Sequence, residues 1–180
     1  MTIEDRVRFG GGAAGIERAE IAMRREAYSP HRHDTYTLGI TLAGVQSFRY
    51  RGAGRASVPG KVFVLHPDEL HDGGPGTETG LGYRALYVAP GLVARAVDRL
   101  PLPFVKEPVC SDPRLVAAIA AAFDDFDAAL DEHAALDLVT ALAEALAQAG
   151  GEDRRPRARA DRRAMQRVAA LIDAAPEKDC

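Results

Sequence analysis

Histidines are the residues of this chain whose type and spacing point most directly to chemistry. Four of the five histidines lie in the first half of the chain: His31, His33, His66 and His71. His31 and His33 are one residue apart, so on a strand both side chains point to the same face of the sheet. Three imidazoles, with water or a carboxylate as the fourth ligand, suit zinc or another divalent transition metal. His31 and His33 are therefore candidate metal ligands, and a later histidine could complete the site.

The groups around these histidines leave alternatives open. Glu69 or Asp72 could supply a carboxylate to the metal, because both lie close to His71 in the sequence. The histidines could instead cap the mouth of a barrel and hydrogen-bond to the backbone or to a ligand. His66 follows an apolar strand, and we expect it to face the core. His133 falls in the charged segment "LDEHAAL", where we expect a solvated side chain.

Thr37 and Thr41 lie an even number of positions along the chain from His31 and His33. On a regular strand the hydroxyls of Thr37 and Thr41 would lie on the same side as His31 and His33. A ligand pocket uses a few polar groups among apolar walls to orient what it binds. Ordinary strand packing is the alternative, because β-branched residues favour strands in any case. We predict that a small-molecule ligand contacts Thr37 and Thr41 together with His31, His33 and His71.

The segments that must position these residues have the pattern of short β-strands. Apolar and polar residues alternate over residues 35–44, 45–52 and 82–90, which predicts half-buried strands. Residues 61–67 are rich in β-branched residues and predict a further strand. Glycine and proline punctuate the joins between these segments. Many short strands at this spacing predict a barrel or a sandwich.

The pattern changes near Pro90, where helical signals replace the alternation. Residues 91–100 predict a short helix. Asp112 or the preceding serine can cap a second helix, with Pro113 in its first turn, and Gly150 with its neighbouring glycine predicts the end of a third. Apolar residues at steps of three or four give these two longer helices one apolar face each. The apolar faces consist of Leu115, Ile119, Phe123, Phe126, Leu130, Leu138, Leu142 and Leu146.

Two arrangements are open for this helical hairpin. Its apolar faces could pack on the barrel within one chain, or a two-fold axis could set the same face against a second copy. We favour a symmetric homodimer through the hairpin.

Composition narrows the class of protein. The chain has 180 residues, of which 47% are hydrophobic and 27% charged, and its net charge is -3, so the chain as a whole shows no basic nucleic-acid footprint. Cys110 and Cys180 lie far apart and in no metal-binding spacing, which is typical of reduced thiols in the cytosol. The N-terminal residues lack the apolar core of a signal peptide, and no run of 18 apolar residues follows. We expect a cytoplasmic protein without a membrane partner.

The C-terminal residues differ from the rest in charge. Between Arg154 and Arg167 there are seven arginines and one aspartate, and Pro156 interrupts any helix there. Dense arginine could bind phosphate without sequence preference, but we favour an extended linker kept open by self-repulsion. Residues 164–180 then begin another amphipathic helix.

The segments "PHRHDTY", "LAG", "VPGKVFVLHPDELHDG" and "YRALYVAP" carry a family resemblance. They resemble the N-terminal effector-binding cupin domain of AraC-family transcriptional regulators. The resemblance covers Ala19 to Gly150 and is strongest from Ser29 to Pro90. It implies a small-molecule effector in the barrel, dimerisation through the helical pair, and control of an attached DNA-binding domain.

The resemblance also implies a division of the chain. The expected fold is mainly β: a cupin-like (jelly-roll) β-barrel at residues 1–104, followed by a C-terminal helical dimerisation hairpin at 105–151. An Arg-rich linker at 152–163 leads to residues 164–180, which resemble the start of a helix-turn-helix DNA-binding domain. About 100 further residues of that domain are expected, so DNA would be contacted only through the missing part, and we expect this sequence to be a fragment.

One departure from the superfamily pattern bears on catalysis. Metal-dependent enzymes of the cupin superfamily place two histidines and a glutamate in their first motif and one histidine in their second. His31 and His33 match the pair and His71 matches the later histidine, so the resemblance implies a metal site of His31, His33 and His71. The glutamate is missing, because Thr37 and Leu38 occupy the places where it would fall. We therefore expect a regulator and no enzyme. The alternative is a metal-dependent cupin enzyme, such as a dioxygenase or isomerase, and a third possibility is a regulator that senses the metal itself.

Overall fold

The computed structural model describes residues 4–97 and 101–151. The predicted linker at 152–163 and the predicted start of a DNA-binding domain at 164–180 lie outside the described residues. Among these residues no helix is both long and apolar enough to cross a membrane.

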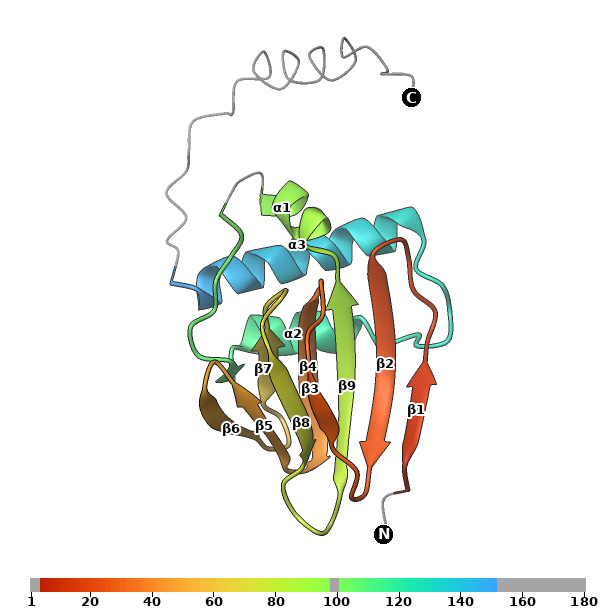
Figure 1. Cartoon of the computed structure of the whole chain (residues 1–180). Coiled ribbons are helices and arrows are strands. Elements are labelled where there is room, and N and C mark those ends of the chain that lie inside the picture. Colours follow the sequence, from red (N-terminus) through yellow and green to blue (C-terminus); the bar gives the residue numbers. More distant parts are fainter. Residues whose placement is uncertain (1–3, 98–100, 152–180) are drawn as a thin grey trace, which may run out of the picture.

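The described strands form two antiparallel sheets that face each other (Figure 1). The six-stranded sheet has the order β1 (Arg6–Phe9), β2 (Ile16–Met23), β9 (Leu81–Val88), β4 (Tyr36–Gly44), β7 (Val62–Leu65) and β10 (Val109–Cys110). The four-stranded sheet has the order β3 (Tyr28–His31), β8 (His71–Pro75), β5 (Gln46–Tyr50) and β6 (Ala53–Ser57). A mainly β fold followed by C-terminal helices was predicted and is confirmed.

Alternation located β4 and β9, two of the longer strands, but the sequence predicted no strand at β8. Its sequence "HDGGP" has glycines where strands normally carry apolar side chains. The reason is close packing: a Cβ added to Gly74 would lie 2.5 Å from the Cβ of Ala27, next to the neighbouring strand β3. Glycine is needed here because the backbones of two segments approach each other. Strand β8 is therefore stabilised by its pairing with the neighbouring strands of the sheet, and its sequence shows no alternation of apolar and polar residues.

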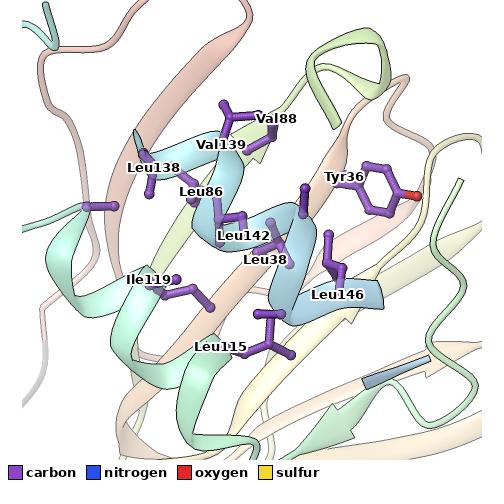
Figure 2. Packing of buried hydrophobic residues seen from close by; sticks show 14 of the residues in the cluster. Tyr36, Leu38, Leu86, Val88, Leu115, Ile119, Leu138, Val139, Leu142 and Leu146 are labelled. Atoms are coloured by element: carbon purple, nitrogen blue, oxygen red, sulfur yellow. The ribbon is translucent and has the colours of Figure 1, made fainter. Parts of the chain in front are cut away.

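Strand β4 is buried on both faces, whereas alternation predicted a half-buried strand. Thr37 and Thr41 face the inside between the sheets, and Tyr36 and Leu38 face outward. The outward residues are nevertheless buried, because the helices cover this face of the six-stranded sheet (Figure 2). Period-two sequence patterning cannot reveal a covering layer that comes from a distant part of the chain.

Three helices follow the strands: α1 (Pro90–Val97), α2 (Pro113–Ala121) and α3 (Glu132–Ala149). Asp112 caps α2 as predicted, because its carboxylate accepts hydrogen bonds from the N–H groups of Arg114 at 2.8 Å and Leu115 at 3.4 Å. Asp131 caps α3 by accepting from the N–H of Ala134 at 2.8 Å.

Helix α2 ends earlier than its apolar periodicity suggests, and buried Arg18 on β2 stabilises the turn that follows. Its guanidinium donates to the carbonyl of Ala122 at 2.6 Å, to that of Asp125 at 3.1 Å, and to those of Gly11 and Ala128. Carbonyls that bond to a guanidinium need no helical partner. A buried arginine from the second strand thus fixes the connection between α2 and α3.

The apolar faces of α2 and α3 pack on their own sheet. Leu115, Ile119, Leu142 and Leu146 are all fully buried, in one cluster with Leu38 and other outward-facing residues of β4 and β9 (Figure 2). This is the intramolecular arrangement, which was the less favoured of the two. The stripe from which the dimer was predicted is therefore already covered within one chain. The homodimer itself stays a prediction that needs other residues.

Candidate metal and ligand site

A cavity of about 150 Å³ lies between the two sheets. Its walls combine aromatic and aliphatic side chains with a small number of polar groups. The lining residues are Met23, Tyr28, His31, His33, Thr37, Gln46, Phe48, Phe63, Leu65, His71, Asp72, Gly73, Gly74, Leu81, Tyr83 and Tyr87. This composition is typical of small-molecule sites, in which apolar walls surround a few convergent polar groups.

The three histidines predicted as metal ligands come together at this cavity. His31 ends β3 and His71 begins β8, and the two are directly paired across these strands. One ligand nitrogen from each of His31, His33 and His71 lies within 4.8 Å of the others, and the Nε2 atoms of His31 and His33 are 3.2 Å apart. Tetrahedral zinc with Zn–N bonds of about 2.0–2.1 Å separates its nitrogens by roughly 3.3–3.4 Å. The spacing of the first two histidines is close to this value.

Backbone carbonyls orient two of the three imidazoles. The Nδ1 of His31 lies 2.7 Å from the carbonyl oxygen of Ser29, and the Nδ1 of His71 lies 2.9 Å from that of Glu69. A carbonyl oxygen only accepts, so Nδ1 carries the proton in both rings and Nε2 keeps its lone pair. A hydrogen bond from the nitrogen that does not bind metal to a backbone carbonyl is the usual way in which proteins orient histidine ligands of metals.

The cavity also favours the neutral form of these rings. Burial lowers the pKa of His33 below its usual value, and the positive charges of His71 and His31 would lower it further. The pKa of His71 is lowered as well, mainly by burial, although its hydrogen bond to Glu69 opposes the shift. Neutral imidazole is the form that binds metal, so the donor set fits a divalent transition ion.

Thr37 and Gln46 place unsatisfied polar atoms at the cavity. Both side chains are more than nine-tenths buried, yet Thr37 Oγ1 and Gln46 Oε1 have no hydrogen-bond partner. An unpaired buried polar group costs free energy unless a ligand or water satisfies it. Gln46 was not predicted, although it shares its parity on β5 with inward-facing Phe48 and Tyr50, and that alternation could have identified it.

Thr41 faces the inside of the fold but does not line the cavity. Its hydroxyl is 2.7 Å from the hydroxyl of Ser57, and both residues are fully buried. Between Thr37 and Thr41 lies Gly39, where an added Cβ would be 2.0 Å from the ring of Phe63. That ring fills the interior beside Gly39, so parity alone could not show that the cavity stops before Thr41.

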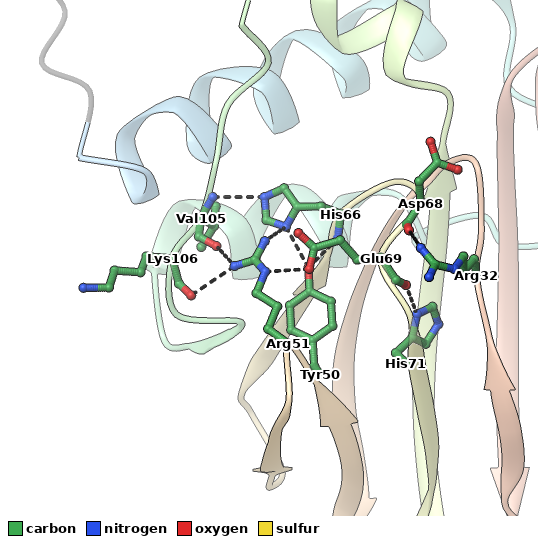
Figure 3. A network of polar contacts seen from close by, with 9 residues as sticks. All are labelled: Arg32, Tyr50, Arg51, His66, Asp68, Glu69, His71, Val105 and Lys106. Atoms are coloured by element: carbon green, nitrogen blue, oxygen red, sulfur yellow. Dashed lines mark hydrogen bonds and ion pairs between the residues drawn. The ribbon is translucent and has the colours of Figure 1, made fainter.

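The two carboxylates considered as fourth ligands hydrogen-bond to other groups of the protein. The Oδ1 of Asp72 accepts a hydrogen bond from the backbone N–H of Arg49 at 2.6 Å. Glu69 forms an ion pair with Arg51, with Oε2 and Nε 2.6 Å apart (Figure 3). In the described part of the chain, neither joins the cluster of His31, His33 and His71.

His66 belongs to a separate polar network, and His133 to the surface. The Nε2 of His66 accepts from the N–H of Val105 at 3.0 Å, and its Nδ1 lies 3.1 Å from the hydroxyl of Tyr50 and 3.0 Å from Arg51 Nη2 (Figure 3). His66 therefore faces the core, as expected, and does not line the cavity. His133 is exposed near the start of α3.

Comparison with known protein families identifies the fold family. The model of the AraC-like ligand binding domain matches residues 14–148. The chain belongs to this family. A comparison with curated proteins finds no match. The cavity and the histidines that line it lie entirely within the matched segment of this AraC-like ligand binding domain.

Solved structures similar to this AraC-like domain include two that are named as cupins. A cupin superfamily protein from Desulfitobacterium hafniense is 11% identical, with 49% of this chain and 81% of that chain covered and a TM-score of 0.45. A cupin 2 conserved barrel domain protein from Salinispora arenicola is 21% identical, with 53% and 85% covered and a TM-score of 0.44. Oxalate decarboxylase from Bacillus subtilis, which has Mn(II) centres, is 12% identical, with 42% and 21% covered and a TM-score of 0.37.

Proposed function

We propose that this chain is the ligand-sensing and dimerising part of an AraC-type transcription factor. A small-molecule effector binds in the cavity beside His31, His33 and His71, and its binding controls an attached DNA-binding domain. The observation that carries this proposal is a cavity at which three histidines meet two buried polar side chains, Thr37 and Gln46, that lack partners. A ligand that hydrogen-bonds to the two unpaired groups would remove the free-energy cost of burying them without partners, so the cavity favours ligand binding.

We further propose that His31, His33 and His71 hold a divalent transition ion such as zinc. The support is the Nε2 geometry, the carbonyl bonds at two Nδ1 atoms and the pKa values lowered at His33 and His71. The ion would supply a Lewis-acid centre that attracts an electron-rich group of the effector. The same cluster would serve a metal-dependent cupin enzyme, which remains the second candidate.

A series of hydrogen bonds, one of them within an ion pair, leads from His71 at the cavity toward the C-terminal end of α3. The carbonyl of Glu69 bonds to His71, its carboxylate bonds to Arg51, and Arg51 Nη1 donates to the carbonyls of Val105 at 3.2 Å and Lys106 at 3.3 Å (Figure 3). The preceding Phe104 packs against the C-terminal end of α3 at Gly150. A shift of His71 on ligand binding would thus reach the segment after α3, where the resemblance places the linker.

The decisive test is the metal content of the protein purified without an affinity tag. Wild-type protein and the surface control His133→Ala should contain about one equivalent of a transition ion, and His71→Ala should lose most of it. Equal metal content in wild type and His71→Ala would show that the cluster is not the site. Turnover of a substrate by the metal-loaded protein would favour the enzyme.

The effector itself is found by mass spectrometry of small molecules that co-purify with the chain. A compound bound by wild type and lost in Thr37→Val would support effector binding in the cavity. A compound retained equally by both proteins would place its binding elsewhere.

A further inference from the structure

The cavity has less negative charge than a bound divalent metal would need for compensation. Among the lining residues Asp72 alone carries a formal charge, and its Oδ1 is held by the N–H of Arg49 at 2.6 Å. The three imidazoles are neutral ligands, so the Asp72 carboxylate can offset at most one of the two charges of a divalent ion held by them. A largely apolar cavity makes such uncompensated charge costly.

From this charge imbalance we infer that the effector is a small carboxylate, which binds with its anionic group at the metal beside Thr37. The inference rests on the metal site proposed above. A carboxylate neutralises part of the ion's charge and fills a coordination position that no described side chain occupies. Hard oxygen ligands from carboxylates are common partners of zinc and related ions.

The position of Thr37 fits this role. Thr37 is paired with Tyr87 across β4 and β9, and the ring of Tyr87 lies 5.4 Å from that of His33. Thr37, Tyr87 and His33 all line the cavity. The unpaired hydroxyl of Thr37 can donate to the carboxylate oxygen that does not contact the metal, which satisfies both groups.

The size and walls of the cavity limit the rest of the ligand. A volume of about 150 Å³ is roughly the volume that accommodates one benzene-sized molecule. Phe48, Phe63 and Leu81 contribute apolar wall, and Gln46 offers a further polar contact. The ligand class is accordingly a monocarboxylate with an apolar body no larger than about one six-membered ring.

Cobalt-loaded protein provides the test, because the visible absorption of Co²⁺ responds to its ligands. Benzoate and formate are titrated against their neutral counterparts benzamide and formamide. We expect benzoate to change the cobalt spectrum and to bind at least tenfold more tightly than benzamide. Removal of the ion with EDTA should abolish the binding of benzoate, as measured by calorimetry.

Two variants of matched size isolate the charge. Thr37→Glu places a carboxylate beside the histidines and should lower the affinity for benzoate at least tenfold while it tightens the binding of Co²⁺. Thr37→Gln has the same size without the charge and should tighten Co²⁺ binding much less. Circular dichroism of both variants establishes that they are folded, and the comparison of wild type with the four probes does not depend on them.

The outcomes separate this inference from the function on which it rests. Failure of wild type to bind Co²⁺ at the histidines would remove the metal site and the inference together. Binding of Co²⁺ with equal affinities for benzoate and benzamide, and no spectral response to formate, would overturn the inference alone. Binding of benzoate that persists without the ion would also overturn it, because protein groups would then recognise the carboxylate.

Discussion

Thr37 and Thr41 lie on the same face of β4 but differ in what their hydroxyls contact. The Thr37 hydroxyl is buried without a partner at the cavity, whereas the Thr41 hydroxyl is 2.7 Å from that of Ser57. A buried hydroxyl without a partner costs free energy, and a paired one contributes stability. The first arrangement suits a binding residue and the second suits a structural one.

The two threonines should therefore respond in opposite ways to replacement by valine. Thr37→Val should raise the free energy of unfolding of the ligand-free protein by about 1 kcal/mol, because it removes an unsatisfied polar group. Thr41→Val should lower it by about 1–2 kcal/mol, because it leaves the Ser57 hydroxyl without its partner. Urea denaturation of both variants checks this, and destabilisation by Thr37→Val would show that its hydroxyl is satisfied within the protein.

His66 should make stability depend on pH. Its pKa is lowered to about 4, first by burial and then by the charge of Arg51. In the unfolded chain the pKa is near 6.5, so between pH 6.5 and 4 the unfolded state binds a proton that the folded state does not. This contribution to stability is complete above pH 6.5 and decreases as the pH falls toward 4, by about 3 kcal/mol in total.

Urea denaturation between pH 7.5 and 4.5 measures this dependence. His33 and His71 add to the slope of wild type, because burial lowers their pKa values too. His66→Gln should remove its own share and give a shallower slope, and His133→Gln controls for the loss of a surface histidine. Identical slopes for wild type and His66→Gln would contradict the assignment.

At the scale of elements, α3 shows which positions hold the helices on the sheet. Leu142 is fully buried against the six-stranded sheet, whereas Leu136 on the same helix is 62% exposed. Deleting a buried leucine side chain removes its transfer free energy and leaves a cavity. The two leucines form a matched pair within one helix.

Leu142→Ala should lower the free energy of unfolding by about 2–5 kcal/mol. Leu136→Ala should change it by no more than about 0.5 kcal/mol, because an exposed leucine loses little contact. Chemical denaturation followed by circular dichroism distinguishes them. Equal effects of the two substitutions would mean that the helix does not pack on the sheet as described.

At the scale of the whole molecule, a homodimer must use surface that remains exposed on the folded chain. The stripe with Ile119 and Leu142 is not such a surface, because both residues are buried within one chain. A charge at either position would have to be buried without a partner, at a cost of several kcal/mol. Substitution there should unfold the domain, and only exposed hairpin residues can report on association.

Sedimentation at about 100 μM, well above the micromolar range of a modest interface, should show wild type as a dimer. Leu136→Asp should shift it to the monomer while circular dichroism stays unchanged, if the exposed face of α3 is the interface. Leu142→Asp should lose its folded spectrum. A wild-type chain that stays monomeric at this concentration would contradict dimerisation through the hairpin.

Local sequence patterns determined a large part of this protein. Alternation located β4 and β9, capping residues such as Asp112 located α2, and the one-residue spacing of His31 and His33 identified the first two members of the cluster. These features depend on neighbours in sequence, because strand parity and helix capping are local properties.

The tertiary structure decided everything that depends on distant partners. It placed Gln46 at the same cavity as the histidines, left Thr41 outside that cavity beyond Phe63, and gave Asp72 and Glu69 hydrogen-bond partners in Arg49 and Arg51. It also buried the apolar stripe of α2 and α3 on the outer face of the sheet. A sequence pattern shows that a face is apolar, but only the packing of the whole chain determines what covers it.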